Sequence, residues 1–183
     1  MFGYSHLSKL KTGLPSCETH YRHWDDKASF NDNVVEYSER TGRTFPFLPK
    51  AYSLYKEKDR KAFLERLEDG NSGMARPWVL KKGNVNQSRG ITMFAGGSKD
   101  LKEIHAALVR GDETMTNPEN GYIMQEYLCN PLLFNGRKFD LRTFWMVASV
   151  DPLVVLYYDG GVMRVSGQPY NETNFDVSIP RQT

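Results

Sequence analysis

The stretch NGRKFDLRTFWMVASVDPLVVLYYDGG, residues 135–161, decides the fold class that we expect for this chain. Near its start, Lys138, Asp140 and Arg142 occupy alternate positions, and the sequence after them is mostly apolar. In a β-strand, successive side chains point to opposite faces, so the three charged side chains share one face and their apolar neighbours share the other. The pattern predicts a long strand that rests on an apolar layer and presents its charges to something polar.

A second long strand is expected to follow the first. The segments 137–150 and 152–166 are rich in β-branched and aromatic residues, and we expect the second to fold back at 159–161, where the sequence is Asp-Gly-Gly. Arg164 on this returning strand adds a further cation, so three cations and one carboxylate could meet in a single cleft. The alternative is a set of ordinary cross-strand ion pairs, each worth at most about 1 kcal/mol when exposed.

The remaining sequence predicts an α+β fold with antiparallel sheets and flanking helices. Apolar residues at helical spacing, and short apolar runs bounded by turn residues, give helices at 56–70 and 98–111 and strands at 78–82, 91–96 and 121–128. Ser98 is the expected N-cap of the second helix. The first forty or so residues show no clean period, and we expect a connection or a truncated domain there.

Composition excludes several classes of protein. The 183 residues carry a formal net charge of +2, with a sequence pI near 8.5, which is too mild for a protein whose main partner is nucleic acid. No apolar run has membrane-spanning length, and the N-terminus lacks the apolar core of a signal peptide. We therefore expect a soluble intracellular protein, long enough to bury a core.

The two cysteines predict neither a disulfide framework nor a metal site. Cys17 and Cys129 lie far apart in unrelated contexts, and we interpret both as free thiols. His20 and His23 follow Cys17, but the spacing C-x2-H-x2-H matches no common set of zinc ligands and no second pair follows.

Two segments have the character of a nucleotide site. In WVLKKGNVNQSRGI, residues 78–91, Lys81 would supply a fixed charge from a strand, and Arg89 with backbone N–H groups of the following loop would close over phosphates. This loop is not a P-loop, because the motif G-x4-G-K-[ST] is absent. In IMQEYL, residues 123–128, a backbone donor and acceptor could read a base beside apolar side chains.

This combination resembles the tubulin tyrosine ligase-like family, whose members are ATP-grasp enzymes. The resemblance is carried by PFLPKAYSL, WVLKKGNVNQSRGI, IMQEYLCNPLLFNGRKFDLRTF, DPLVVLYYDGGVMRVS and GQPYNETNF, in the order and spacing of the family. It covers roughly residues 45–183. It implies an ATP-grasp-like fold with a central nucleotide-binding domain at 45–134 and the start of an incomplete C-terminal domain at 135–183, preceded by the connection or truncated domain at 1–44.

The resemblance also implies roles for individual residues. Residues that match the family's nucleotide contacts are Lys81, Arg89, Gln125, Glu126, Tyr127, Leu128 and Lys138. Residues that match its catalytic positions are Asp140, which would contact the nucleotide or the incoming amino acid, and Arg142 and Arg164, which would hold the acyl phosphate or the acceptor carboxylate. Such a reaction gathers negative charge in one place, so cations must be fixed in advance.

The family's chemistry gives the expected cofactors and partners. ATP phosphorylates a glutamate or C-terminal carboxylate, and the amine of a free amino acid, which would be glutamate, glycine or tyrosine, then forms the amide. The expected acceptor is tubulin or microtubules, with no nucleic acid and no membrane as partner. The expected location is the cytoplasm and cytoskeleton, including the axoneme of a cilium or flagellum. Mg²⁺ is expected to be held by residues outside this chain, so no metal ligand is assigned within it.

Several departures from the family keep alternatives open. Lys82 stands where proline is common, Ser88 where the phosphate loop has glycine, and Glu126 where a basic residue is common. The sequence also stops before the family's metal-binding segments, so we expect the chain alone to be inactive. The first hypothesis is a piece of an ATP-dependent tubulin ligase. The second is a non-catalytic module that binds tubulin or microtubules, and a third is a ligase for another carboxylate.

Overall fold

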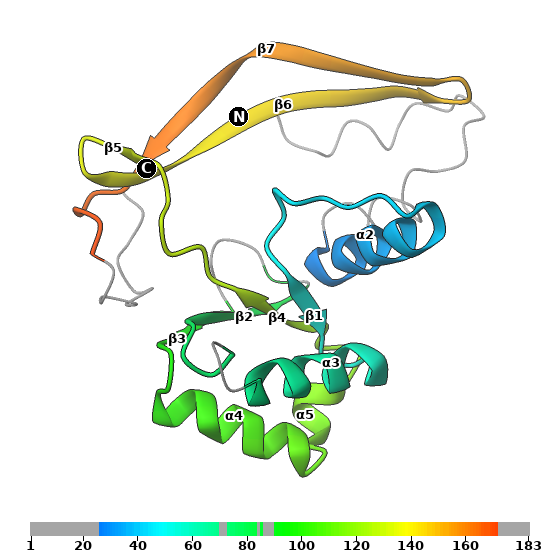
Figure 1. Ribbon diagram of the computed structural model, residues 1–183. Coiled ribbons are helices and arrows are strands. Elements are labelled where there is room, and N and C mark those ends of the chain that lie inside the picture. The colour runs from blue at the N-terminus through cyan, green and yellow to red at the C-terminus, as the bar shows by residue number, and fades with distance from the viewer. Residues whose placement is uncertain (1–25, 70–72, 84, 86–89, 172–183) are drawn as a thin grey trace. The chain divides into compact units, whose positions relative to one another are not determined.

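The computed structural model describes residues 26–69, 73–83, 85 and 90–171. The chain divides into two units, Met1–Tyr127 and Leu128–Thr183, and each is described by itself (Figure 1). Both units combine antiparallel strands, and the first adds helices, which confirms the expected α+β class. Among the described residues, no helix is both long and apolar enough to span a membrane.

The first unit is built on a four-stranded antiparallel sheet. Its strands lie in the order β1 (Ala51–Ser53), β4 (Tyr122–Glu126), β2 (Trp78–Lys82) and β3 (Ile91–Phe94). Strands β2 and β3 form the predicted hairpin, in which Trp78 lies opposite Phe94 and Lys81 opposite Ile91. Strand β2 also pairs with β4, so that it lies inside the sheet with neighbours on both edges.

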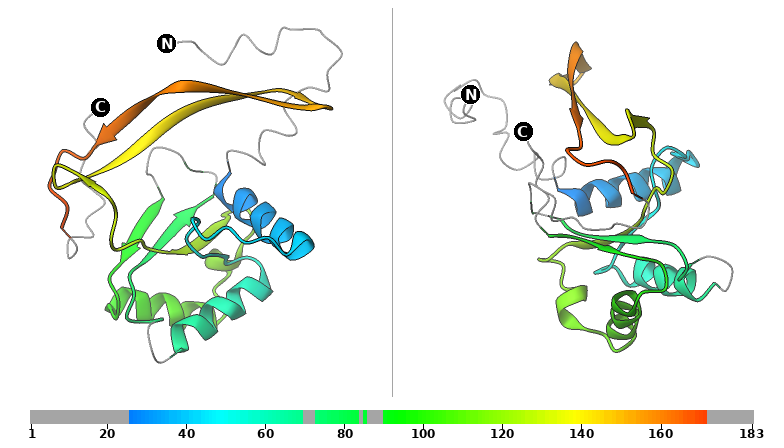
Figure 2. Two further views of the ribbon diagram at one scale, coloured as in Figure 1. Left: turned by 45° about the horizontal axis from the view of Figure 1, so that its top comes forward. Right: turned by 90° about the vertical axis from the view of Figure 1, so that its left-hand side faces the viewer.

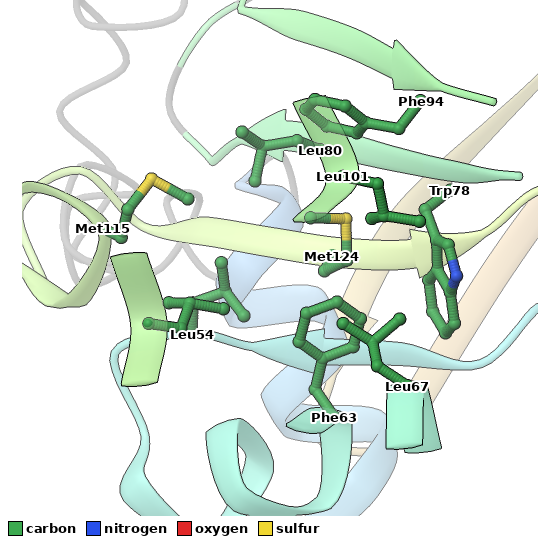
Figure 3. Packing of buried hydrophobic residues seen from close by; sticks show 10 residues of the cluster. Leu54, Phe63, Leu67, Trp78, Leu80, Phe94, Leu101, Met115 and Met124 are labelled. Carbon is green, nitrogen blue, oxygen red and sulfur yellow. The ribbon is translucent and has the colours of Figure 1, made fainter. Parts of the chain in front are cut away.

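Three helices cover one face of this sheet and build the core. They are α3 (Glu57–Glu68), α4 (Lys99–Val109) and the short α5 (Glu113–Thr116). Figure 3 shows the packed side chains, which come from helices and strands alike: Leu54, Phe63, Leu67, Trp78, Leu80, Phe94, Leu101, Leu108, Met115 and Met124. The indole N–H of Trp78 donates to the carbonyl of Gly73 at 2.9 Å, so the fully buried ring leaves no polar group unsatisfied.

The predicted helix cap is present. Ser98 precedes α4, and its hydroxyl accepts the N–H of Leu101 at 3.2 Å. Leu101 and Leu108, two turns apart, are both buried. The predicted apolar stripe of this helix therefore faces the core.

The segment expected to be a connection contains a helix. Helix α2 (Lys27–Thr41) begins at Asp26, whose carboxylate accepts the N–H of Ser29 at 2.7 Å, and ends at Gly42 with φ of 69°. Of its residues only Ala28 is buried, which explains why no apolar stripe marks it in the sequence. Both views in Figure 2 place α2 on the face of the sheet opposite to α3, α4 and α5.

A polar cluster fastens α2 to the edge of the sheet. Asp32 accepts hydrogen bonds from the hydroxyl of Ser53 at 2.7 Å and the hydroxyl of Tyr55 at 2.5 Å, and it pairs with the ammonium of Lys56 at 2.8 Å. Asn31 donates to the fully buried Ser53 hydroxyl at 3.1 Å. Burial, and then the bond to Asp32, raise the pKa of Tyr55 far above its ordinary value, so its hydroxyl remains a donor.

The first turn of α2 lies on a glycine. The N–H of Gly83, just after β2, donates to the carbonyl of Gly121 at 3.0 Å. A Cβ atom at position 83 would lie 2.8 Å from a carboxylate oxygen of Asp26 and 3.3 Å from Cβ of Ala28. A side chain at position 83 would displace the Asp26 carboxylate and crowd Ala28, so glycine lets the helix approach this closely without any shift.

The second unit is a long antiparallel ribbon. Its strands are β5 (Leu133–Phe134), β6 (Arg137–Val150) and β7 (Leu153–Val165), in that order. The predicted reversal at 159–161 is wrong, because β7 continues through these residues and the register with β6 is only interrupted there, between Thr143 and Phe144. The chain reverses at Asp151–Pro152, between β6 and β7. A glycine-rich strand segment can mark an irregularity in a ladder as well as a turn.

Both faces of this ribbon carry exposed apolar side chains within the second unit. Trp145 and Tyr157 lie opposite one another on one face, and Met146 and Leu156 on the other, and all four are between 51% and 64% exposed. The apolar anchoring face that the sequence predicts is therefore only one of two apolar surfaces here. Near the start of β6 the second face carries the charged residues instead.

The cluster around Asp32 should be worth more than a surface ion pair. Changing Asp32→Ala leaves the buried Ser53 hydroxyl without its acceptor, and we expect the free energy of unfolding to fall by about 2–3 kcal/mol. Chemical denaturation measures the change. The matched control is Glu39→Ala, which breaks the exposed pair with Lys58 and should leave stability unaltered. Equal effects of the two substitutions would contradict the assigned role of Asp32.

Candidate functional site

A cavity lies in the first unit between α2, the segment at 44–51 and the sheet. Its volume is about 520 Å³, and its lining includes the apolar side chains of Phe30, Val34 and Ile123 together with Lys81 and Gln125. A cavity lined by both apolar side chains and polar groups can hold a small molecule.

Strand alternation directs Lys81 into this cavity. Trp78 and Leu80 on β2 point into the core, so Lys81 points to the opposite face. Its ammonium donates to the side-chain oxygen of Gln125 on the neighbouring strand. Burial, and secondarily the positive charge of Lys27, lower the pKa of Lys81. An anion bound at this amine would offset both effects.

Glu126 is directed away from the cavity. Its carboxylate pairs with Arg66 of α3 at 3.3 Å and with Arg76 at 3.6 Å, and its side chain is only 16% exposed. The carboxylate of Glu126 is therefore neutralised by two arginines on the helix-covered side of the sheet. Its position next to Gln125 in the strand requires this, because neighbouring side chains face opposite ways.

The backbone of the predicted base-reading segment is partly engaged. The N–H of Glu126 donates to the carbonyl of Lys50 at 2.9 Å, and the N–H of Tyr127 donates to the carbonyl of Pro77 at 3.2 Å. A ligand must therefore use other backbone groups of this segment. Leu128, the first residue of the second unit, has a side chain that is 60% exposed.

In the second unit, the cross-strand register brings Asp140 and Arg164 together. They lie directly opposite on β6 and β7, and the guanidinium donates two hydrogen bonds to the carboxylate, at 2.6 and 2.8 Å. Arg142 lies on the same face, opposite Val162, and it is exposed. Within the part of the chain that the structure describes, Arg142 forms no ion pair. Besides Lys138, the charged face thus contains one neutralised pair and one exposed cation, Arg142.

Lys138 is held by Tyr170, which lies in the segment GQPYNETNF that carries the resemblance but to which the sequence analysis assigns no role. Its ammonium lies 5.3 Å from the centroid of the Tyr170 ring, and its carbonyl accepts the N–H of Ser166 at 2.7 Å. Tyr170 donates its hydroxyl to the carbonyl of Cys129 at 2.5 Å and its N–H to the carbonyl of Gly136 at 2.8 Å. Burial lowers the pKa of Lys138. Only the presence of an aromatic residue after the strand could have suggested Tyr170.

The other predicted site features have mixed outcomes. Arg89 and Ser88 lie outside the described residues, as do Cys17, His20 and His23. Cys129 is exposed and, among the described residues, forms no disulfide. His105 on α4 contacts Glu68 at 3.2 Å. Among the described residues, no three His, Cys, Asp or Glu side chains gather where they could hold a metal ion.

Comparison with known proteins gives a consistent set of relatives. The model of the tubulin-tyrosine ligase family matches residues 15–179. The chain is 32% identical over 109 residues to tubulin monoglycylase TTLL3 of Danio rerio, which covers 60% of this chain and 13% of the relative. It is 30% identical over 160 residues to tubulin glycylase 3D of Tetrahymena thermophila, covering 86% and 13% respectively.

A third relative carries a different name. The probable alpha-tubulin polyglutamylase Ttll1 of Tetrahymena thermophila is 30% identical over 148 residues, which is 78% of this chain and 31% of the relative. The chain therefore spans less than a third of the length of each of these three relatives.

The contacts of Tyr170 predict a measurable effect on the backbone around Lys138. Tyr170→Leu removes the hydroxyl donor and the ring beside the ammonium, and together these losses should speed hydrogen exchange at the amides of Ser166 and Tyr170 about tenfold. Tyr170→Phe keeps the ring and should give a smaller increase. Mass spectrometry after exchange measures both. Identical behaviour of the two variants would show that the ring contributes nothing.

Proposed function

The chain belongs to the tubulin-tyrosine ligase family, and from this premise we propose that the protein is an ATP-dependent ligase that joins a free amino acid to a carboxylate of tubulin. The single observation that supports nucleotide binding most directly is Lys81. A partly buried ammonium on an interior strand, close to a second lysine and in the lining of a cavity, is disfavoured until an anion arrives. A polyphosphate with an apolar base fits that combination.

We propose nucleotide contacts in each unit taken by itself. In the first unit, Lys81 and Gln125 line the cavity, and the adjoining segment 125–128 would contact the base. In the second unit, Lys138 would contact a phosphate, because its lowered pKa gives it the same preference for an anion. ATP supplies the phosphoryl group that activates the acceptor carboxylate.

The charged face of the ribbon would serve the acceptor and the amino acid. Arg142, an exposed cation, is the residue that we assign to the carboxylate of the tubulin tail. The two hydrogen bonds from Arg164 to Asp140 fix both side chains before any ligand binds. Charges that are fixed in advance can stabilise the charge that develops in a transition state without having to reorganise. No step is assigned to Mg²⁺, because the described residues offer no cluster of metal ligands.

The names of the relatives narrow the amino acid that we propose. Two of the relatives described above are named as glycylases and one as a polyglutamylase. We therefore place glycine and glutamate first and tyrosine third. The ATP-grasp architecture of the complete site and an association with cilia are parts of the same proposal.

One observation favours a second candidate, a non-catalytic module that binds tubulin. Asp140 and Arg164 neutralise each other in the present register, as ordinary cross-strand ion pairs do. If that pair is only structural, the charged face would attract acidic tubulin tails through Arg142 without transferring anything to them.

Lys138→Ala separates nucleotide binding from general stability. The substitution removes a charge-assisted contact worth roughly 1.5–3 kcal/mol, so we expect ATP affinity to fall by at least tenfold in calorimetry on the full-length protein. Lys99→Ala, at an ammonium 88% exposed on α4, is the matched control and should bind ATP normally. Unaltered affinity in the Lys138 variant would remove this residue from the site.

Arg142→Ala should impair ligation and spare ATP binding, in contrast to Lys138→Ala. We expect ATP affinity to persist and ligation of labelled glycine, glutamate or tyrosine to tubulin to fall by about 10²–10³-fold. A parallel loss of both properties would show that Arg142 belongs to the nucleotide contacts instead. Absence of ligation by the unchanged full-length protein, with tubulin still bound, would favour the non-catalytic module.

Arg164→Lys distinguishes a catalytic fork from a structural ion pair. Lysine keeps the charge and cannot donate two parallel hydrogen bonds, so the geometry of Asp140 is lost. Because both side chains are more than 40% exposed, we expect stability to change by less than about 1 kcal/mol. Ligation should fall by roughly tenfold or more while the melting temperature stays the same. A normal ligation rate would assign the pair to the fold alone.

A further inference from the structure

Lys27 has a set of contacts that no motif in the sequence explains. It is the first residue of α2, and its ammonium donates to the carbonyl of Gly83 at 3.2 Å and to the carbonyl of Val85 at 2.7 Å. Both carbonyls follow directly after β2, the strand that carries Lys81. A residue more than fifty positions earlier in the chain thus holds the end of this strand.

The surrounding geometry makes this attachment rigid. Gly83 donates its own N–H to the carbonyl of Gly121, and a Cβ atom at position 83 would crowd Asp26 and Ala28. The first turn of α2 and the residues after β2 therefore meet without a gap. Movement of the ammonium of Lys27 would release two carbonyls and loosen the backbone beside Lys81.

Lys27 also contributes charge. It lines the same cavity as Lys81, together with the exposed Lys50, Gln125 and the carboxylate of Asp26. The ammonium of Lys27 is bonded to neutral carbonyls, and among the described residues it forms no ion pair with a carboxylate. Its positive charge therefore reaches Lys81 without a bound counter-ion and adds to burial in lowering the pKa of Lys81.

We propose that Lys27 is a positioning residue for Lys81: it fixes the backbone after β2 through Gly83 and Val85 and supplies a second positive charge in the same cavity. The ligand that this arrangement would bind is a polyphosphate, and the identity of the ligand rests on the proposed function. The placement of Lys81 is a property of the free protein. It can be measured without any nucleotide.

The first experiment follows the reaction of Lys81 with an amine-reactive reagent across a range of pH, with the labelled peptide quantified by mass spectrometry. The midpoint of the profile reports the pKa of the amine and the plateau reports its accessibility. Lys27→Met removes the neighbouring charge and the two hydrogen bonds, and both losses favour the protonated form of Lys81. We expect the midpoint to move to higher pH and the plateau to rise.

Matched variants isolate the role of position 27. Lys50→Met removes one exposed positive charge from the same cavity and should leave the midpoint unaltered. Lys27→Arg keeps the charge and the donors and should restore the original profile. Lys27→Gln keeps a donor without the charge, so it should move the midpoint with little effect on the plateau, and it replaces the Met variant if that one fails to fold. An unmoved midpoint in Lys27→Gln and Lys27→Met, or an equal shift in Lys50→Met, would overturn the proposal.

The second experiment measures the affinity of the full-length protein for a non-hydrolysable ATP analogue by calorimetry. We expect Lys27→Met to bind about tenfold more weakly, and Lys27→Arg and the surface variant Lys99→Met to bind within about twofold of the unchanged protein. Normal affinity in Lys27→Met would overturn the functional part of the proposal. Failure of the unchanged protein to bind the analogue would overturn the proposed function instead, whereas the labelling midpoints decide the positioning role in either case.

Discussion

The first unit depends on the register of β2. Trp78 and Leu80 must point to the helices for the core to close, and the two-residue repeat of a strand then forces Lys81 to the other face. A slip by one residue would bury the lysine in the core and expose the leucine, at a large cost in free energy. The position of the candidate anion-binding amine is therefore fixed by the hydrophobic core on the opposite side of the sheet.

The same alternation explains two residues that look contradictory in the sequence. Gln125 and Glu126 are neighbours in a segment expected to contact a nucleotide, yet only Gln125 lines the cavity. Glu126 lies on the core side at the end of β4, where Arg66 and Arg76 compensate its charge. An acidic residue at that position does not place negative charge in the cavity. In the sequence, Glu126 looks like a departure from the family, whereas in the structure its carboxylate pairs with two arginines away from the cavity.

Much of the fold follows from patterns within single segments. The helices at Glu57–Glu68 and Lys99–Val109 and three of the four strands of the first sheet have clear patterns and end signals, and the sequence predicts them. The three-residue strand β1 (Ala51–Ser53) is not predicted. Helix α2 has only Ala28 buried, so its period is too weak to identify it. The contacts of Lys27 and Tyr170 join segments far apart in the chain, and nothing local to either residue indicates its partner. The sequence identifies the charges at positions 138–142 but not which of them the register will pair.

The interruption between Thr143 and Phe144 divides the ribbon into two halves with different chemistry. On one side lies the paired fork of Asp140 and Arg164, and on the other lie apolar pairs such as Met146 with Leu156. Because the ladder is already broken at that point, insertions or deletions in the apolar half need not shift the register of the charged half. A change of length at the far end of the hairpin would therefore alter what the apolar surface contacts and leave the pairing of the charged end in place.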